Sequence, residues 1–520
     1  MSPNASPFTR ATLVILVLAV FLAGRSAFAQ PIVSFTVNAT YDAVDASPGD
    51  GACGDATGAC TLRAAVMESN ALPGLNSIDF GGTLVLTIPG TGEDAAATGD
   101  LDVTDSLGIT GDVIDGGGLD RVFDVDPTST GAVHVSFAYV TIRNGSTSAA
   151  AGTPDDRGGG ILNRGSASLF FANVVDSEAD KGGGVFNQGK FETAGPTEIR
   201  NNRSAGTPAS AGGGIYNTGS LDVRQGVVEG NSSSLGGGIF NSGQARFQIG
   251  RITANSATIS GGGVSNEGTI TITESTINGN STGLGNTGSD VPSTPSGTAT
   301  LTNSTISGNT STGIVNGGNL SLTNVTIAEN GGTGLAGGPV GTISLKNTIV
   351  GKNAAADCSS TPSLISLGHN LDSDGSCRLA GPGDISNVDP KLGPLTLHST
   401  PYFSTTFAHA LLTGSPAIDA GGNNGCPFSD QRGVQRPQDG NGDGIAVCDI
   451  GAFEADAIAQ TPVPTPEPTA GPTPTPVLPA DVPRTGGPPG EAGLPFTLAV
   501  AALPALIGAA ALFRRFLRRR

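Results

Sequence analysis

The stretch GGGIYNTGSLDVRQGVVEGNSSSLGGGIFNSG, residues 212–243, contains nearly the same phrase twice, 24 residues apart. A second phrase, of the kind STINGN, alternates with it at residues 275–280, 304–309 and 325–330. Periods of about 20–50 residues are typical of repeat proteins, in which each repeat buries a face of the next. Counted from its asparagine, the first phrase recurs at Asn163, Asn187, Asn217, Asn241 and Asn266, and in weaker form at Asn286 and Asn316.

The repeats predict an all-β fold. Segments such as 221–224 and 270–273 alternate apolar and polar residues, which is the period of a half-buried strand. Glycine and asparagine, which tolerate positive φ, end these segments and allow the chain to turn. Three short strands in each repeat, at intervals that vary from 20 to 30 residues, predict a right-handed parallel β-helix over residues 101–355.

The repeated asparagine predicts a ladder at one corner of the coil. An inward-pointing amide at that corner can donate to the asparagine of one neighbouring coil and accept from the other. The alternative for the glycine-rich phrase, a phosphate-binding loop, would require a helix directly after it. We therefore expect Asn163, Asn187, Asn217, Asn241 and Asn266 to stack inside the solenoid.

The composition favours an elongated, acidic protein of an oxidising compartment. The 520 residues include 80 Gly, 20 Phe and no Trp, which is too few large apolar side chains for several ordinary cores. Acidic residues outnumber basic residues 44 to 26, so a nucleic-acid partner is not expected. Six cysteines fall into three local pairs, for which disulfides are expected although other connectivities remain open: Cys53 with Cys60, Cys358 with Cys377, and Cys426 with Cys448.

Both ends of the chain have the composition of targeting segments. Residues 1–29 combine a basic residue, an apolar run and an A-x-A cleavage site, which predicts a secretory signal peptide. The Pro/Thr-rich residues 457–493 predict a disordered linker, and the apolar residues 494–513 predict a transmembrane helix. Residues 514–520 are a basic tail, which the positive-inside rule places in the cytoplasm. The body of the protein is therefore expected outside the cell and anchored to the membrane.

The segment VPRTG, residues 482–486, offers a second route to anchoring. It resembles the LPxTG sorting signal, which sortases cleave between Thr and Gly, but it has Val in the first position. A sortase-like processing enzyme would cut between Thr485 and Gly486, whereas a plain membrane anchor would keep the apolar helix. Both alternatives tether the protein at the cell surface.

Two segments that flank the repeats resemble domains of bacterial surface proteins. Residues 30–100 contain CTLRAA at positions 60–65, which is similar to the signature of the CSLREA N-terminal domain but departs from it at Thr61 and Ala64. Residues 61–71 also predict a short amphipathic helix that would cap the first coil. Residues 356–456, with SPAIDAGGNNG and CDIGAFEAD, resemble the choice-of-anchor Q domain. The repeats themselves resemble those of pectate-lyase-like and polymorphic outer-membrane proteins, and none of these resemblances implies a known reaction.

One candidate binding site is a column of charged residues. Glu192, Asp222 and Arg246 each stand five residues after a ladder asparagine. They should therefore lie side by side on the outer face of successive coils, about 4.8 Å apart. Two carboxylates beside a guanidinium could hold a cation or a uronate, and the alternative is an ordinary solvated row of charges.

A second candidate site is a column of aromatic residues. Phe186, Tyr216 and Phe240 each directly precede a ladder asparagine. If the column faces outward, it forms a platform for sugar rings or for a protein partner. If the register is reversed, the same residues belong to the core.

The sequence DGNGDG, residues 439–444, has the start of a calcium-binding loop. The bidentate Glu expected later in such a loop is absent, because that position is Ile450, next to Asp449. Asp439, Asn441, Asp443 and Asp449 are therefore candidate ligands for calcium, the one cofactor that the sequence indicates. An Asx-rich turn is the alternative.

The sequence shows no nucleophile with a recognisable base. We therefore expect a secreted, surface-anchored β-helix protein with an adhesive or structural role, on the extracellular face of a bacterial cell envelope. Its expected ligands are surface polysaccharides or proteins. The alternative is an extracellular polysaccharide lyase or glycoside hydrolase of the pectin-lyase-like fold.

Overall fold

The structure is a computed structural model, and it describes residues 32–147, 156–206, 210–286, 297–360, 364–399 and 405–457. All of these residues belong to one compact unit, residues 1–460. The expected signal peptide, the linker beyond residue 457, the apolar helix, the basic tail and the Thr485–Gly486 bond lie outside the described residues. Within the described ranges, no helix is long and apolar enough to cross a membrane.

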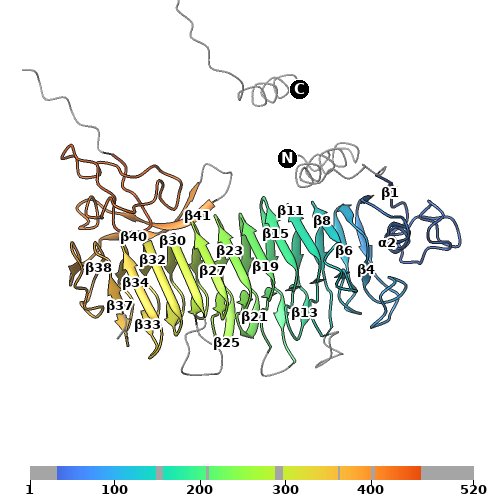
Figure 1. Ribbon diagram of the computed structural model, residues 1–520, viewed down its shortest axis with the longest axis horizontal. Coiled ribbons are helices and arrows are strands. Elements are labelled where there is room, and N and C mark those ends of the chain that lie inside the picture. Colours follow the sequence, from blue (N-terminus) through green and yellow to red (C-terminus); the bar gives the residue numbers. More distant parts are fainter. Residues whose placement is uncertain are drawn as a thin grey trace, which may run out of the picture. The chain divides into compact units, whose positions relative to one another are not determined.

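The repeat that contains Asn217 forms one coil of a parallel β-solenoid. It runs through β18 (Ile215–Asn217), β19 (Ser220–Arg224), β20 (Gly226–Glu229) and β21 (Ser232–Leu235). Each of these strands pairs in parallel with the equivalent strand of the next coil. Figure 1 shows the resulting stack of coils, with equivalent strands side by side along the solenoid.

The first sheet consists of one strand from each of eleven successive coils. Seven of these strands end on the repeated asparagine. In spatial order they are β4 (Leu101–Val103), β7 (Phe123–Val125), β10 (Ile161–Asn163), β14 (Val185–Asn187), β18, β22 (Ile239–Asn241), β26 (Val264–Asn266), β29 (Leu284–Asn286), β31 (Ile314–Asn316), β33 (Thr333–Gly337) and β36 (Ala356–Ser359).

The second sheet carries the longest regular face of the solenoid, and its strands alternate inward and outward side chains. Five-residue strands with this pattern match the period-2 alternation predicted from the sequence. In spatial order they are β1 (Ser34–Thr36), β2 (Asn76–Asp79), β5 (Leu107–Thr110), β8 (His134–Ala138), β11 (Ser166–Phe170), β15 (Lys190–Ala194), β19, β23 (Gln244–Gln248), β27 (Thr269–Thr273), β30 (Thr298–Ser307), β32 (Asn319–Ala328), β34 (Thr342–Lys346) and β37 (Leu364–Ser366).

The third sheet follows the second around the coil, and the ten-residue strands β30 and β32 run through both sheets. Its other strands are β3 (Thr83–Val85), β6 (Val113–Asp115), β9 (Thr141–Arg143), β12 (Asn173–Val175), β16 (Thr197–Arg200), β20, β24 (Arg251–Thr253), β28 (Thr276–Asn278), β35 (Ile349–Gly351), β38 (Leu371–Asp372) and β39 (Ile385–Ser386). A smaller four-stranded sheet contains β13 (Glu178–Ala179), β17 (Arg203–Ser204), β21 and β25 (Ser256–Ser260).

The glycine triplet of the repeat allows neighbouring coils to approach closely. A Cβ atom on Gly213 would lie 2.4 Å from the carbonyl oxygen of Ser232 and 2.5 Å from that of Gly237. Any side chain at this position would therefore collide with the backbone of the next coil. Gly212 has φ +67°, in the left-handed region that favours glycine.

The repeated asparagines form a continuous ladder of hydrogen bonds inside the solenoid. The Nδ2 of each asparagine donates to the Oδ1 of the next at 2.7–2.8 Å, and every member is buried. The second acceptor of each Nδ2 is a backbone carbonyl of the next coil, as in the bond from Asn217 to Gln244 O (3.1 Å). The ladder runs through Asn163, Asn187, Asn217, Asn241, Asn266, Asn286 and Asn316.

A second asparagine ladder, which was not predicted from the sequence, occupies another corner of the solenoid. Each asparagine donates two hydrogen bonds to the Oδ1 of the next asparagine, one from its backbone N and one from its Nδ2. For example, Asn231 donates to Asn255 Oδ1 from N at 2.9 Å and from Nδ2 at 3.0 Å. Its signal is the final asparagine of the STINGN phrase. The ladder contains Asn202, Asn231, Asn255, Asn280, Asn309, Asn330 and Asn353.

The helix expected at residues 61–71 is present as α2 (Leu62–Ala71), with Thr61 as its N-cap. Its fully buried Arg63 pairs with Asp42 at 2.8 Å and donates to the carbonyl oxygens of Ala96 (2.9 Å), Gly99 (2.8 Å) and Asp100 (3.0 Å). The guanidinium therefore ties the helix to the loop that precedes β4.

The C-terminal part of the chain first extends the solenoid and then folds back along it. Strands β36 to β39 continue the coil pattern beyond residue 355, where the repeats were expected to end. The hairpin of β40 (Leu392–Ser399) and β41 (Thr405–Leu411) then lies beside β28 and β30, as Figure 1 shows. Gln431 fixes this contact by donating to Thr276 Oγ1 (3.1 Å) and by accepting from Thr305 Oγ1 (2.6 Å).

All three local cysteine pairs form disulfides in the structure. They close loops of 7, 19 and 22 residues by sequence separation. The last of them lies in the segment that folds back, where Asn324 of β32 donates to the carbonyl oxygen of Asp449 at 3.0 Å. The disulfides are Cys53–Cys60, Cys358–Cys377 and Cys426–Cys448.

Replacing Asn217 by Leu should lower the free energy of unfolding by about 1–3 kcal/mol, because Asn187 loses its acceptor and Asn241 loses its donor inside the coil. Ser220→Ala, at an exposed position of the same coil, is the matched control and should change it by less than about 0.5 kcal/mol. Urea unfolding followed by circular dichroism measures both. Superimposable curves for the wild type and Asn217→Leu would contradict a stabilising ladder.

Candidate functional site

The predicted charged column exists on the outer face of the second sheet. Glu192 of β15 pairs in register with Asp222 of β19, which pairs with Arg246 of β23. Ser168 and Thr271 continue the column on either side. The inward neighbours of Asp222, Leu221 and Val223, are buried, so the charged side chains point away from the core.

Each carboxylate of this column forms an ion pair with a basic residue of its own strand. Lys190 Nζ lies 2.6 Å from Glu192 Oε1, and Arg224 donates to Asp222 Oδ2 at 2.9 Å. Arg246, the expected partner, is exposed and makes no ion pair within 4 Å in the described part of the chain. Sequence reasoning missed Lys190 and Arg224, although residues two apart on a strand share a face and gave the signal.

The hydrogen bond from Arg224 to Asp222 raises the pKa of the arginine. The side chain therefore stays protonated throughout the ordinary pH range. About half of the Arg224 side chain remains exposed, so it can still meet a ligand from solvent. It can bind an anion or a hydroxyl group, but it cannot accept a proton.

A shallow hollow of about 180 Å³ lies over this part of the sheet. The hollow exists because small residues occupy outward positions on three adjacent strands, namely Ser136, Ser168 and Ala194. The other residues that line it include Phe170, Glu192, Asp222 and Arg224. The strands β8, β11, β15 and β19 run side by side beneath it (Figure 1). The hollow therefore joins an apolar wall to a charged one.

The apolar wall belongs to a group of three aromatic residues at the bend after the second sheet. The ring centroids of Phe170 and Phe171 lie 4.7 Å apart. Tyr139 stacks on Phe171, with ring centroids 5.5 Å apart. Tyr139 and Phe171 both have positive φ, which turns the chain toward the third sheet. Phe171 is 39% exposed and leans over Gly195, where a Cβ would lie 2.8 Å from its ring. We call Tyr139, Phe170 and Phe171 the aromatic group.

His134 stands near the charged end of the hollow, at the start of β8. Its Nδ1 lies 3.1 Å from the Oγ of Ser166, the in-register residue on β11. Burial lowers the pKa of His134, so the imidazole is neutral near pH 7. A neutral imidazole can accept a proton.

The second predicted column is well ordered but offers almost no open surface. The rings of Phe186, Tyr216 and Phe240 stack along the first sheet with centroids 4.8 and 4.7 Å apart. Phe186 and Phe240 are only 3% and 5% exposed, and Arg157 and Lys181 lie over the rings of Phe186 and Tyr216 at 5.0 and 5.9 Å. This column is a packed stack rather than an open platform.

The residues proposed for calcium form an Asx-rich turn. Asp439 Oδ1 accepts from the backbone N of Gly442 (2.8 Å) and Asp443 (3.1 Å), and its Oδ2 accepts from Gly444 N (2.9 Å). Asn441 Nδ2 donates to Asp443 Oδ2 at 3.2 Å. Asp449 is buried, and burial raises its pKa to about 7. Among the residues that the structure describes, no cluster of carboxylates brings Asp439, Asp443 and Asp449 together.

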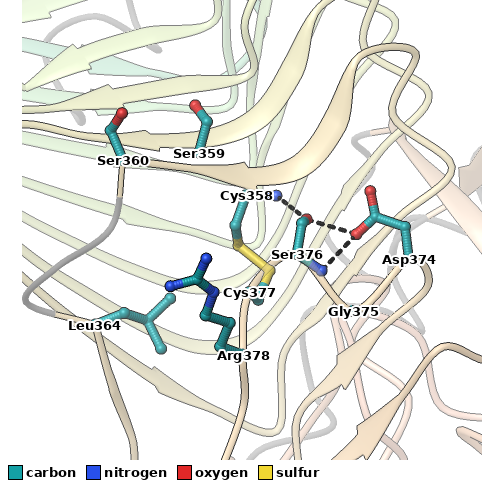
Figure 2. Close-up of a pocket in the computed structure, with 9 residues that line it drawn as sticks. All are labelled: Cys358, Ser359, Ser360, Leu364, Asp374, Gly375, Ser376, Cys377 and Arg378. Atoms are coloured by element: carbon teal, nitrogen blue, oxygen red, sulfur yellow. Dashed lines mark hydrogen bonds between the residues drawn. A yellow bond between two sulfur atoms is a disulfide. The ribbon is translucent and has the colours of Figure 1, made fainter.

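A larger hollow, of about 790 Å³, opens beside the Cys358–Cys377 disulfide near the last coils (Figure 2). Two of its polar residues are paired with each other or with the backbone: Ser376 Oγ donates to Asp374 at 2.5 Å, and Cys358 N donates to Ser376 Oγ at 2.8 Å. Residues 361–363, between two of the residues that line it, lie outside the described ranges. The hollow over β8 to β19 is therefore the stronger candidate.

Comparison with known proteins assigns no family. No protein-family model matches the chain, and no curated protein matches it. A crystal structure of pectate lyase Pel9A aligns with a TM-score of 0.39 and 14% identity, over 82% of this chain and 98% of that chain. A similarity of this extent assigns no residue, substrate or reaction. The resemblances of residues 30–100 to the CSLREA domain and of residues 356–456 to the choice-of-anchor Q domain remain interpretations of the sequence.

Replacing Asp222 by Asn should change the free energy of unfolding by no more than about 0.5 kcal/mol, because its ion pair with Arg224 is partly exposed to water. Phe247→Ala, which empties an interior position of the next coil, is the contrasting variant and should cost about 3–5 kcal/mol. Urea unfolding compares the two. A loss of similar size in both variants would mean that the charged column has a structural rather than a binding role.

Proposed function

We propose that this protein is a secreted, surface-anchored β-helix protein that binds carbohydrate without cleaving it. The proposed binding surface is the hollow over β8, β11, β15 and β19. The observation that carries the proposal is the aromatic group, with Phe171 exposed and Tyr139 and Phe170 half-buried, beside ion-paired carboxylates on one sheet. Both features face solvent, whereas the interior of the coil is closed by its own side chains.

The chemistry of this surface suits a sugar chain. One face of a sugar ring is made of C–H groups, and contact with the exposed ring of Phe171 would remove that apolar surface from water. The hydroxyl and carboxyl groups of the sugar could then bond with Arg224 and Lys190, since hydrogen bonds to charged groups are the stronger ones. An acidic sugar would gain most from the two basic side chains.

The arrangement favours binding over hydrolysis. A glycoside hydrolase needs two carboxyl groups, one of which donates a proton to the leaving group. Glu192 and Asp222 are instead each held in an ion pair by a basic residue of the same strand. A surface that positions charges and rings, without a free proton donor between them, is suited to adhesion.

A lyase is the alternative function, and one observation supports it. A lyase must remove a proton from carbon, which requires a base, and Arg224 is held protonated by Asp222. His134, whose pKa is lowered by burial, could accept that proton. This alternative predicts cleavage of a uronate polymer that stops in the His134→Gln variant.

The proposed location rests on the segments outside the described residues. A signal peptide at residues 1–29 would export the chain, and either the apolar helix or a sortase acting at Thr485 would anchor it. A linker of residues 457–493, at about 3.1 Å per extended residue, could hold the solenoid up to ~100 Å from the membrane. The binding face would then be presented to polysaccharides or proteins of the surroundings.

Replacing Phe171 by Ala should weaken binding of acidic oligosaccharides by about tenfold, because stacking contacts of an aromatic ring contribute about 1–1.5 kcal/mol. Phe428→Ala removes a ring that is 78% exposed on the C-terminal segment and is the matched control. Calorimetric titration of the full chain with a panel of acidic and neutral oligosaccharides measures the affinities.

Two outcomes of that titration would contradict the proposal. One is that Phe171→Ala and Phe428→Ala bind every oligosaccharide as the wild type does. The other is that the wild type shortens the oligosaccharides, detected by mass spectrometry of the recovered ligand, because this would favour the lyase or hydrolase alternative.

A further inference from the structure

Three buried carboxylates meet near the start of the solenoid. Asp102 of β4 pairs in register with Asp124 of β7, and Asp100 stands two residues before Asp102. Asp100, Asp102 and Asp124 are only 4%, 1% and 3% exposed. One carboxylate oxygen from each lies within 4.8 Å of the others. Three negative charges are therefore gathered in one buried place, which is costly without compensation.

Two arginines compensate part of this charge. Arg121 lies 2.9 Å from Asp124 Oδ2 and 3.5 Å from Asp100 Oδ2, and Arg164 bonds to Asp124 Oδ1. Both oxygens of Asp124 are thus engaged. These ion pairs involve Asp100 and Asp124 but not Asp102.

Asp102 has a carboxylate oxygen without a donor. Its Oδ2 accepts from the backbone N of Ala96 at 2.9 Å, but its Oδ1 is buried and has no hydrogen-bond partner within the described ranges. A buried oxygen of this kind normally has a partner, because leaving it unpaired is unfavourable. The partner of this oxygen must be a hydrogen-bond donor or a cation.

A second group of three aspartates shows that clustering alone does not produce this situation. Asp357, Asp372 and Asp374 also have oxygens within 4.8 Å of one another. There, however, every carboxylate oxygen accepts from a backbone N–H or a side-chain donor nearby. That group is explained by turn hydrogen bonds, whereas the first group is not.

We propose that Asp100, Asp102 and Asp124 bind a divalent cation, with calcium as the preferred ion. Carboxylate oxygens are the ligands that calcium takes, and the unpaired Oδ1 of Asp102 would be one of them. The backbone around the site is already fixed, because Arg63 holds the carbonyls of Ala96, Gly99 and Asp100. A bound ion would join two successive coils and the preceding loop, and would stabilise the N-terminal end of the solenoid.

The test is a calcium titration of the full chain after dialysis against a chelator. Addition of CaCl2 should raise the melting temperature of the wild type by about 2 °C or more, since an ion that binds only the folded state stabilises it. The Asp102→Asn variant should lose this response. Without calcium it should melt no lower than the wild type, because it carries one buried negative charge fewer, and circular dichroism checks that it is folded.

Controls separate this site from the other acidic groups. Asp100→Asn should lose the calcium response as Asp102→Asn does, whereas Asp372→Asn in the second group and Asp443→Asn in the Asx-rich turn should keep it. MgCl2 in place of CaCl2 should give a smaller shift, because magnesium demands a stricter octahedral geometry. The proposal is overturned if the wild type shows no calcium response, if both variants of the first group keep it, or if Asp443→Asn removes it.

Discussion

The structure depends on stacking identical coils so that each buried amide meets the amide of the next coil. A parallel solenoid repeats the same position at the same place, so a polar residue at a corner always has copies of itself above and below. Asparagine suits this geometry because its amide both donates and accepts. The two ladders, represented by Asn217 and Asn255, therefore satisfy buried corners that would otherwise contain unpaired groups.

The fixed register of the ladders determines what the outer face can present. Because each coil is held in line with the next, outward side chains form straight columns. Functional groups from successive coils therefore lie next to one another along each column. Glu192 and Asp222 lie side by side for this reason, and each takes a basic partner two residues away on its own strand. The aromatic group adds an apolar border at the bend after the sheet. A rigid wall of this kind can hold an extended ligand without moving.

Features that recur in every repeat could mostly be predicted from the sequence, whereas contacts between distant segments could not. The interval between Asn217 and Asn241 was sufficient to predict coils, strand alternation and the first ladder, because each is a local consequence of period and residue type. The outward column that contains Asp222 followed from the same alternation. The second ladder was missed because the residue before its asparagine varies, as in Ala254, Gly279 and Glu329, so the phrase is less regular.

Features that depend on distant contacts could not be predicted in the same way. Gln431 meets Thr276 only because the C-terminal segment folds back along the coils, and neither residue has a distinctive sequence context. The group of Asp100, Asp102 and Asp124 arises because two strands align in register, while the sequence shows only acidic residues beside turns. The burial of Phe186 likewise depends on a basic side chain from another part of the coil.

Hydrogen–deuterium exchange, measured by mass spectrometry on the Asn217→Leu variant, tests most directly whether the ladder holds the coils in line. The account predicts faster exchange in β14, β18 and β22, and also in β15 and β19, whose outer face forms the candidate site. Exchange in the β40–β41 hairpin should stay as in the wild type. Unchanged protection in β14, β18 and β22 would contradict the account, because the coils would then be held together without the asparagine ladder.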